Sequence, residues 1–168
     1  MGVAVVLMVF GIGEGSVDIA LESASYKTGD TVRGKAVLHL KSSKQANGLR
    51  LRFYAQRREQ RWVGATAKKP AHYEPHTVVL HTQEKVLAPK GSFPAGDSEY
   101  AFEVVVPNLN LPAPAAPSPL GGLGQVLGGL AGAIPPAQTY PIEWRLNVSL
   151  DLPMSLDIQK EIPVLLTG

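Results

Sequence analysis

Apolar and polar residues alternate along several short stretches of this chain. In residues 25–40 (SYKTGDTVRGKAVLHL), a turn pair at Gly29-Asp30 is followed by apolar or small residues at every second position from Val32 to Leu40. Arg33, Lys35, Val37 and His39 fall on the opposite face. A period of two predicts a half-buried β-strand, and glycine supplies the positive φ that such a turn often needs.

Similar stretches recur along the chain, separated by clusters of turn residues. We expect strands at 3–10, 16–22, 31–41, 48–54 and onward toward 62, 76–87, 99–106, 139–150 and 156–166. The intervening loops are expected at 11–15, 41–48, 64–75 and 89–96. Strands joined by turns, with no helical pattern between most of them, predict an all-β, antiparallel, immunoglobulin-like β-sandwich of about seven to nine strands.

Composition agrees with this fold class. The chain has 168 residues, 45% of them hydrophobic, which fits one domain over residues 1–168 with a substantial core. The absence of cysteine excludes disulfides and thiolate metal sites and is typical of a reducing compartment, so we expect a cytoplasmic protein. The apolar run at 3–10 is too short to span a bilayer and lacks a basic leader, and it is interpreted as a buried strand.

Residues 107–138 break the rhythm of strands with a Pro/Gly/Leu-rich insertion. Its apolar residues have spacings of three and four, which would place them on one face of a helix: Leu123, Val126, Leu127 and Leu130. The many glycines around them oppose a stable helix, each by about 1 kcal/mol relative to alanine. We therefore expect a loop that covers the sandwich or becomes ordered on a partner; membrane contact is disfavoured because no basic flank accompanies it.

Basic residues concentrate between positions 41 and 69. The predicted partner-binding face within this region consists of Arg50, Arg52, Arg57, Arg58 and Arg61. The planar arginine fork suits carboxylates and phosphates, which favours an acidic or phosphorylated peptide or an anionic lipid surface. The alternative is a solvated face paired with acids on neighbouring strands, such as Glu99, Glu103 and Glu143. No recognition motif for nucleic acid accompanies the charge.

Motifs for catalysis are not found. His72 and His76 have helical metal-ligand spacing, but Pro75 disfavours a helix there. The glycines at 11–15 belong to no complete nucleotide-binding fingerprint, and no Gly-x-Ser-x-Gly elbow occurs. We therefore expect a protein that is not an enzyme, with no catalytic residue, no cofactor and no metal ligand.

Three stretches together resemble the amino-terminal domain of the arrestin family. The first, YKTGDTVRGK at 26–35, is similar to that family's turn into a strand. The second, FPAGDSEYAF at 93–102 and on to Pro107, is similar to its glycine turn, aromatic strand and closing proline. The third, 140–164, is similar to its last hairpin. Their order and spacing carry the resemblance, which covers most of 16–166.

The resemblance implies an arrestin-type β-sandwich that binds proteins as an adaptor or scaffold, similar to arrestin-related and sporulation-control-like proteins. We expect it to hold a partner segment by a strand edge and the basic face. Full-length arrestins have two such domains and this chain has length for one, which suggests the hypothesis of a homodimer. The alternative is a structural subunit of a larger or membrane-associated assembly that uses residues 120–134 as an interaction arm.

Overall fold

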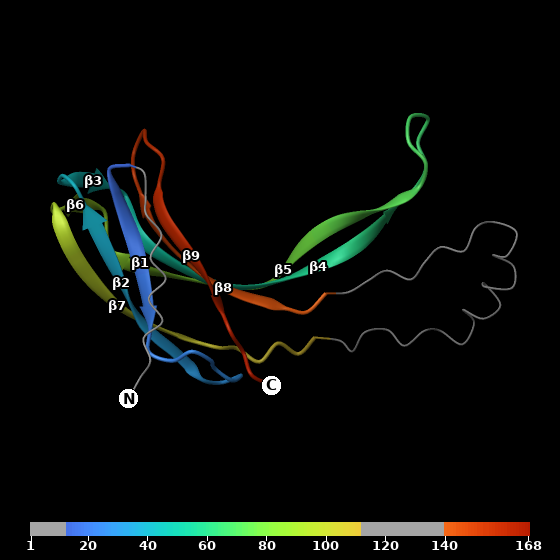
Figure 1. The fold of residues 1–168 in the computed structure, drawn as a ribbon, viewed down its shortest axis with the longest axis horizontal. Coiled ribbons are helices and arrows are strands. Elements are labelled where there is room, and N and C mark those ends of the chain that lie inside the picture. Colours follow the sequence, from blue (N-terminus) through green and yellow to red (C-terminus); the bar gives the residue numbers. More distant parts are fainter. Residues whose placement is uncertain (1–12, 112–139) are drawn as a thin grey trace, which may run out of the picture. The chain divides into compact units, whose positions relative to one another are not determined.

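The computed structural model describes residues 13–111 and 140–168, and in these residues the fold is all-β, as predicted (Figure 1). No helix occurs in this part of the chain. The strands are β1 (Gly15–Leu21), β2 (Thr31–Leu40), β3 (Lys44–Ala46), β4 (Gly48–Val63), β5 (His72–Ala88), β6 (Gly91–Phe93), β7 (Gly96–Val105), β8 (Glu143–Asp151) and β9 (Ile158–Val164).

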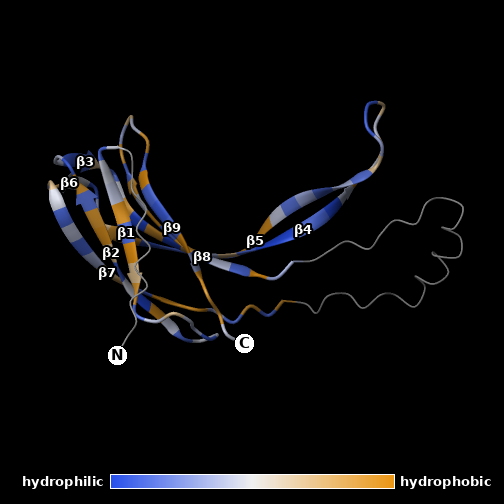
Figure 2. Cartoon of the chain, viewed as in Figure 1, coloured by the Kyte–Doolittle hydropathy of each residue, from blue (hydrophilic) through white to orange (hydrophobic). Residues whose placement is uncertain are grey.

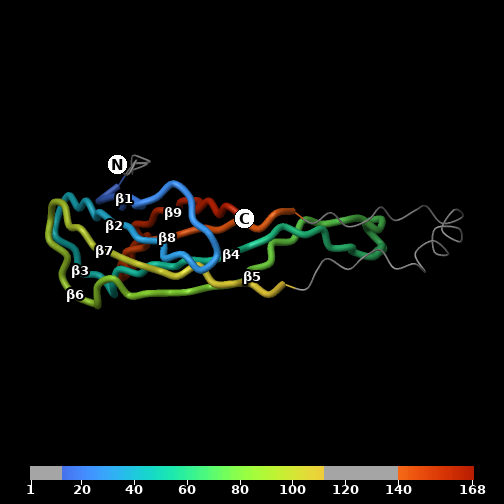
Figure 3. Tube along the Cα trace, turned by 90° about the horizontal axis from the view of Figure 1, so that it is seen from below, coloured from blue at the N-terminus to red at the C-terminus, as the bar shows by residue number. Residues whose placement is uncertain are grey.

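The strands form three sheets. One has the order β1-β2-β7, a second has the order β5-β4-β8-β9, and β3 pairs with β6 in a third. The strand pairs with a described register are antiparallel; examples are Ile19 opposite Ala36 and Leu51 opposite Val148. The edge strands β1 and β9 lie beside each other in the views of Figures 1 and 3.

Contacts divide the chain into two compact units. The first comprises the residues up to Gln56, Val79–Asn108 and Ile142–Gly168, and it contains the sandwich core. The second comprises Arg57–Val78 and Leu109–Pro141, and therefore includes the end of β4 and the start of β5. Within this second unit, the rings of Trp62 and Tyr73 meet edge to face, with their centroids 4.9 Å apart.

The core is formed by residues at alternate strand positions. Hydrophobic and hydrophilic residues accordingly alternate along the strands in Figure 2. The largest fully buried side chains are Phe53, Leu38, Leu49, Leu51, Leu146, Leu150, Val32, Val106 and Val148. Phe53 of β4 stacks on Trp144 of β8 with 5.1 Å between the ring centroids. No polar or charged residue is buried as a whole in the described parts of the chain, so apolar burial and backbone pairing hold the sheets together.

The structure differs from the expected loops at three places. The predicted loops 41–48 and 89–96 each contain a three-residue strand, β3 and β6, which pair with each other. The predicted loop 64–75 ends early because β5 begins at His72. Strands this short carry no readable alternation, and their pairing depends on residues far apart in the chain. The predicted strand at 3–10 lies outside the described residues, as does most of the insertion at 107–138.

Gly34 allows close packing inside the three-stranded sheet. It lies opposite Phe102, and a Cβ atom at this position would lie 2.8 Å from Cζ of that ring. The same Cβ would lie 2.4 Å from the backbone oxygen of Ala20 on β1. A backbone oxygen within a ladder cannot move aside cheaply, so the β1-β2-β7 sheet requires glycine here.

We therefore predict that Gly34→Ala lowers the free energy of unfolding by about 1–3 kcal/mol, the usual cost of overpacking. Gly91→Ala is the matched control, because a Cβ at Gly91 would meet nothing within 4 Å. Urea unfolding of the two variants measures the difference. Equal stability of the two variants would contradict this packing.

Candidate functional site

The arginines predicted to form one basic face are divided between the two compact units. Arg50 and Arg52 belong to the first unit, on the exposed face of β4, which is an inner strand of the four-stranded sheet. Arg57, Arg58 and Arg61 belong to the second unit. The arginines are therefore described below as two groups, one in each unit, and their action as one binding face stays a prediction.

Arg50 and Arg52 face neutral residues across the sheet. Ser149 of β8 lies opposite Arg50, and Asn147 lies opposite Arg52. Neither arginine has an acidic side chain within ion-pair distance in the described residues. The guanidinium of Arg52 lies over the ring of Tyr54, 4.7 Å from its centroid. This cation–π contact restrains Arg52 while leaving its N–H groups available.

Two acids of the same sheet, Glu161 and Glu143, are held by other groups. Tyr54 donates its hydroxyl proton to Glu161 Oε2 at 2.6 Å, and Arg145 Nη1 donates to Glu161 Oε1 at 2.7 Å. Arg145 Nη2 also lies 3.3 Å from Glu143 Oε2. Burial and the hydrogen bond to Glu161 raise the pKa of Tyr54 to about 12. Burial raises the pKa of Glu161, but the hydrogen bonds from Tyr54 and Arg145 outweigh it and the pKa is lowered.

The arginines of the second unit are partly neutralised. Arg57 forms an ion pair with Glu59, and its Nε donates to Glu59 Oε1 at 2.9 Å. Arg58 and Arg61 are exposed and have no ion pair among the described residues. Because their positions differ by an odd number of residues in a strand, their side chains point to opposite faces.

The exposed face of the three-stranded sheet carries matched charges. Arg33 of β2 lies 3.5 Å from Glu103 of β7, and Lys35 lies 3.1 Å from Glu99. These two acids were considered as partners of the basic region at 41–69, but they pair with β2. Opposite charges on neighbouring strands are a common means of stabilising a sheet and its register.

His39 connects all three strands of that sheet. Its Nδ1 lies 2.6 Å from Asp97 Oδ1 on β7, and its Nε2 lies 3.1 Å from Asp18 Oδ2 on β1. The hydrogen bond to Asp97, which outweighs partial burial, and the further bond to Asp18 raise the pKa of His39. Protonation lets both ring nitrogens donate at once, so the charged form is the one that ties β1, β2 and β7 together.

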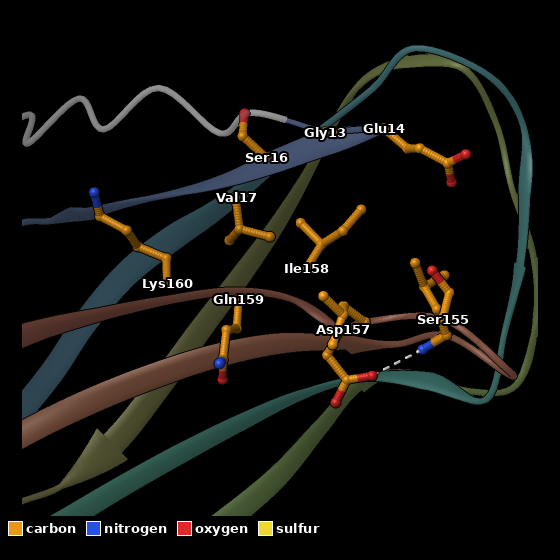
Figure 4. A pocket seen from close by; sticks show the side chains of 12 residues that line it. Gly13, Glu14, Ser16, Val17, Ser155, Asp157, Ile158, Gln159 and Lys160 are labelled. Carbon is orange, nitrogen blue, oxygen red and sulfur yellow. Dashed lines mark hydrogen bonds between the residues drawn. The ribbon is translucent and has the colours of Figure 1, made fainter.

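A groove of about 420 Å³ lies between the start of β1 and the start of β9 (Figure 4). Val17 from β1 and Ile158 from β9 point toward each other in it. Both strands are the last in their sheets, and no strand of the described chain pairs with their outer edges. The groove therefore combines an apolar floor with unpaired backbone groups, which is the arrangement that a further strand can use.

Lys160 adds a cation to this groove. It lies opposite Val148, so it belongs to the inward-facing positions of β9, and Figure 4 shows its side chain directed toward β1. Its Nζ is buried and has no hydrogen-bond partner among the described residues. The sequence analysis did not single out Lys160. The available signal was its place in the alternation of Ile158, Ile162 and Val164, where an apolar residue is expected.

The free edge of β9 can be assigned from a proline. Pro163 lies opposite Arg145 within the strand, and proline is tolerated where its nitrogen faces away from the partner strand. The backbone N–H groups of the alternate residues Gln159 and Glu161 therefore face the free edge. Two apolar side chains stand close by in the β8–β9 turn: Met154 and Leu156 are 107% and 91% exposed, and Met154 has a φ of 59°.

The remaining predicted sites bring nothing further together. The loop residues Leu123, Val126, Leu127 and Leu130 lie outside the described residues. Within residues 13–111 and 140–168, no group of three or more potential ligands could hold a metal ion. His72 instead contacts the Pro70 carbonyl and Glu74. In the part of the chain that the structure describes, no helix is long and apolar enough to cross a bilayer.

Comparisons with known proteins agree with this architecture. The family model described as "Arrestin (or S-antigen), N-terminal domain" matches residues 16–127. Among solved structures, the chain is similar to the sporulation control protein Spo0M from Bacillus subtilis, with a TM-score of 0.58 and 14% sequence identity. The likeness covers 94% of this chain and 51% of that chain, so this chain spans about half the length of the solved protein. A search of curated proteins finds no significant match.

The contacts of His39 predict a stability that falls as the pH rises. Because the pKa of His39 is raised in the folded state, its contribution is complete below the unfolded-state pKa of about 6.5 and is lost as the pH rises through the folded-state value. Wild type should exceed His39→Gln by about 0.2–1 kcal/mol at pH 5.5, as is usual for an exposed pair, and by less at pH 8.5. Urea unfolding at both pH values tests this; an advantage that grows with pH would contradict it.

Proposed function

Because this chain belongs to the family of the arrestin amino-terminal domain, we propose that it is a non-catalytic adaptor or scaffold that binds an extended segment of a partner protein. The segment lies along the groove between β1 and β9 and pairs with a free strand edge. The observation that carries this proposal is the meeting of two unpaired edges over an apolar floor. In such β-augmentation, backbone hydrogen bonds contribute affinity and side-chain pockets contribute specificity.

The chemistry of the groove supports a segment with both apolar and acidic residues. Val17 and Ile158 offer an apolar surface, and exposed Leu156 borders it. The Nζ of Lys160 has no partner in the described chain. A buried ammonium group without a partner is unfavourable, so a carboxylate from the bound segment would stabilise it. An acidic side chain next to an apolar one is therefore the expected signature of the partner.

A second copy of the chain is one candidate for the bound partner. An unpaired strand edge can pair with the same edge of another molecule, which generates a two-fold symmetric dimer. Met154 and Leu156, which are exposed beside this edge, would bury apolar surface away from water in such a contact. Self-association would occupy the groove and would compete with the binding of another segment.

We predict that Gln159→Pro abolishes capture of partner proteins from a lysate of the source organism. The substitution removes a backbone donor from the free edge of β9, while the ladder to β8 remains, as it does at Pro163. Gln159→Ala is the matched control, because it shortens the same side chain and keeps the donor. Quantitative mass spectrometry of captured proteins measures the effect. Retention of the same proteins by Gln159→Pro would refute binding along this edge.

The same edge predicts a concentration-dependent dimer. Sedimentation velocity of the full chain should show a monomer–dimer equilibrium that Gln159→Pro shifts toward monomer and Gln159→Ala does not. A single monomeric species at the highest attainable concentration would exclude self-association through β9 and leave a different protein as the partner.

A further inference from the structure

We propose that the β8–β9 turn of one molecule inserts into a pocket at the opposite end of the β8–β9 hairpin of a second copy of this chain. The inserted side chains are Met154 and Leu156. The pocket lies where β8 starts and β9 ends, and it is distinct from the groove between β1 and β9. The inference goes beyond the proposed function, because it requires neither a free strand edge nor an extended partner segment.

The two most exposed large apolar side chains of the described residues lie in this turn. Met154 is 107% exposed and Leu156 is 91% exposed, whereas the next in order, Leu165, is 66% exposed. Single exposed apolar residues are common on soluble proteins, but these two lie two positions apart and contribute nothing to the core. Their transfer from water into an apolar site would be favourable.

The conformation of the turn does not account for its apolar residues. Met154 has a φ of 59°, in the left-handed region that glycine and asparagine adopt more readily. Turn formation alone would therefore favour a residue other than methionine at this position. The turn is also held from within, because the backbone N–H of Leu152 donates to Asp157 Oδ1 at 3.2 Å. A fixed turn loses less conformational freedom on binding than a mobile one, which favours association.

A pocket of about 410 Å³ lies at the other end of the hairpin. Most of the residues that line it are apolar: Ile142, Trp144, Pro163, Val164, Leu165 and Leu166. Its volume is within the range of pockets that take up a ligand. Backbone hydrogen bonds hold the segment after β9 in place, because Tyr26 N–H donates to the Leu165 carbonyl and Thr167 N–H donates to the Tyr26 carbonyl. The pocket is therefore preformed in the described chain.

Charge at the turn and at the pocket is complementary. The turn is flanked by Asp151 and Asp157, and neither has a cation within ion-pair distance among the described residues. The cation in the pocket wall is Arg145, whose Nη atoms hold Glu143 and Glu161. Its Nε is buried and has no hydrogen-bond partner in the same residues. A carboxylate that enters beside the apolar side chains can accept a charge-assisted hydrogen bond from this Nε.

The strand beside this wall adds no charge of its own. On β4, Gln56 lies opposite Glu143 and Tyr54 lies opposite Arg145, and both residues of β4 are neutral. Gln56 Nε2 also donates to Glu143 Oε2 at 3.4 Å. The carboxylates next to Arg145 are thus already bound by groups of the same sheet.

A contact between two different ends of one chain has a defined consequence for assembly. Each molecule offers one turn and one pocket, so the contact repeats from copy to copy, whereas a two-fold contact is complete in a dimer. The turn and the end of β9 lie at opposite ends of the first unit, so one molecule can use both at once (Figure 1). Because a single turn buries little area, we expect weak association that appears only at high protein concentration.

Sedimentation velocity of the full chain carrying Gln159→Pro tests the proposal. This substitution blocks pairing along β9 and changes no residue of the turn or of the pocket. The protein should form species larger than a dimer as its concentration rises. Addition of Met154→Gln with Leu156→Gln, the turn variant, should weaken this association at least about tenfold, because two apolar side chains are no longer buried.

A second variant and a matched control complete the experiment. Leu165→Asp, the pocket variant, places a charge in the pocket wall and should also weaken association at least about tenfold. Val79→Gln with Val86→Gln removes two exposed apolar side chains from β5 and should alter association less than about twofold. The turn variant keeps its pocket and the pocket variant keeps its turn, so an equal mixture should form one-to-one heterodimers although neither variant associates alone.

The outcomes separate this inference from the proposed function. A Gln159→Pro protein that stays monomeric at the highest attainable concentration would overturn the inference, as would association that the turn variant retains. A mixture of the turn and pocket variants that stays monomeric would indicate a two-fold contact and would overturn it as well. None of these results bears on the capture of a partner segment along β9, which is measured separately with Gln159→Pro and Gln159→Ala.

Discussion

The apolar layer between the two larger sheets is the constraint on which the rest of the structure depends. Leu49, Leu51 and Phe53 of β4 are fully buried in it, and Leu146 and Val148 of β8 are buried opposite them. Because side chains alternate between faces, a shift of one residue would bring arginine into this layer and expose leucine. The direction of Arg50 and Arg52 toward solvent is therefore a direct consequence of core packing.

The charged residues on the exposed faces of the sheets lie at the strand positions that alternate with the core positions. The face of β1-β2-β7 balances its cations against acids on adjacent strands, and His39 is shared between Asp18 and Asp97. On the four-stranded sheet, Arg145 pairs with Glu143 and Glu161. These pairs favour the observed register, and they concentrate the unbalanced positive charge of β4 at positions that the core does not use. Alternate residues at the start of β4 thus contribute to the core and carry the exposed charge.

Much of the architecture could be predicted from alternation and turn residues. The strands that became β2, β4 and β7 have strict period-two patterns, and the arrestin-type sandwich followed from them together with three family-like stretches. The order of strands within the sheets could not be predicted, because nothing local distinguishes an edge strand such as β9 from an inner strand such as β4.

The surroundings of the candidate site residues depend on the order of the strands within the sheets. The five predicted arginines belong to two compact units, so their action as one face stays a prediction. Lys160 was overlooked because a lysine is normally assigned to solvent, and only its register with Val148 shows that it faces inward. For Lys160 the missing information was long-range pairing, which a local pattern does not contain. The same long-range pairing bears on synthesis: β4 meets its core partner β8 only after β5, β6 and β7 have been made. Leu49, Leu51 and Phe53 therefore remain without their β8 partners on the nascent chain until β8 has been made, so we expect this part of the core to form late in synthesis.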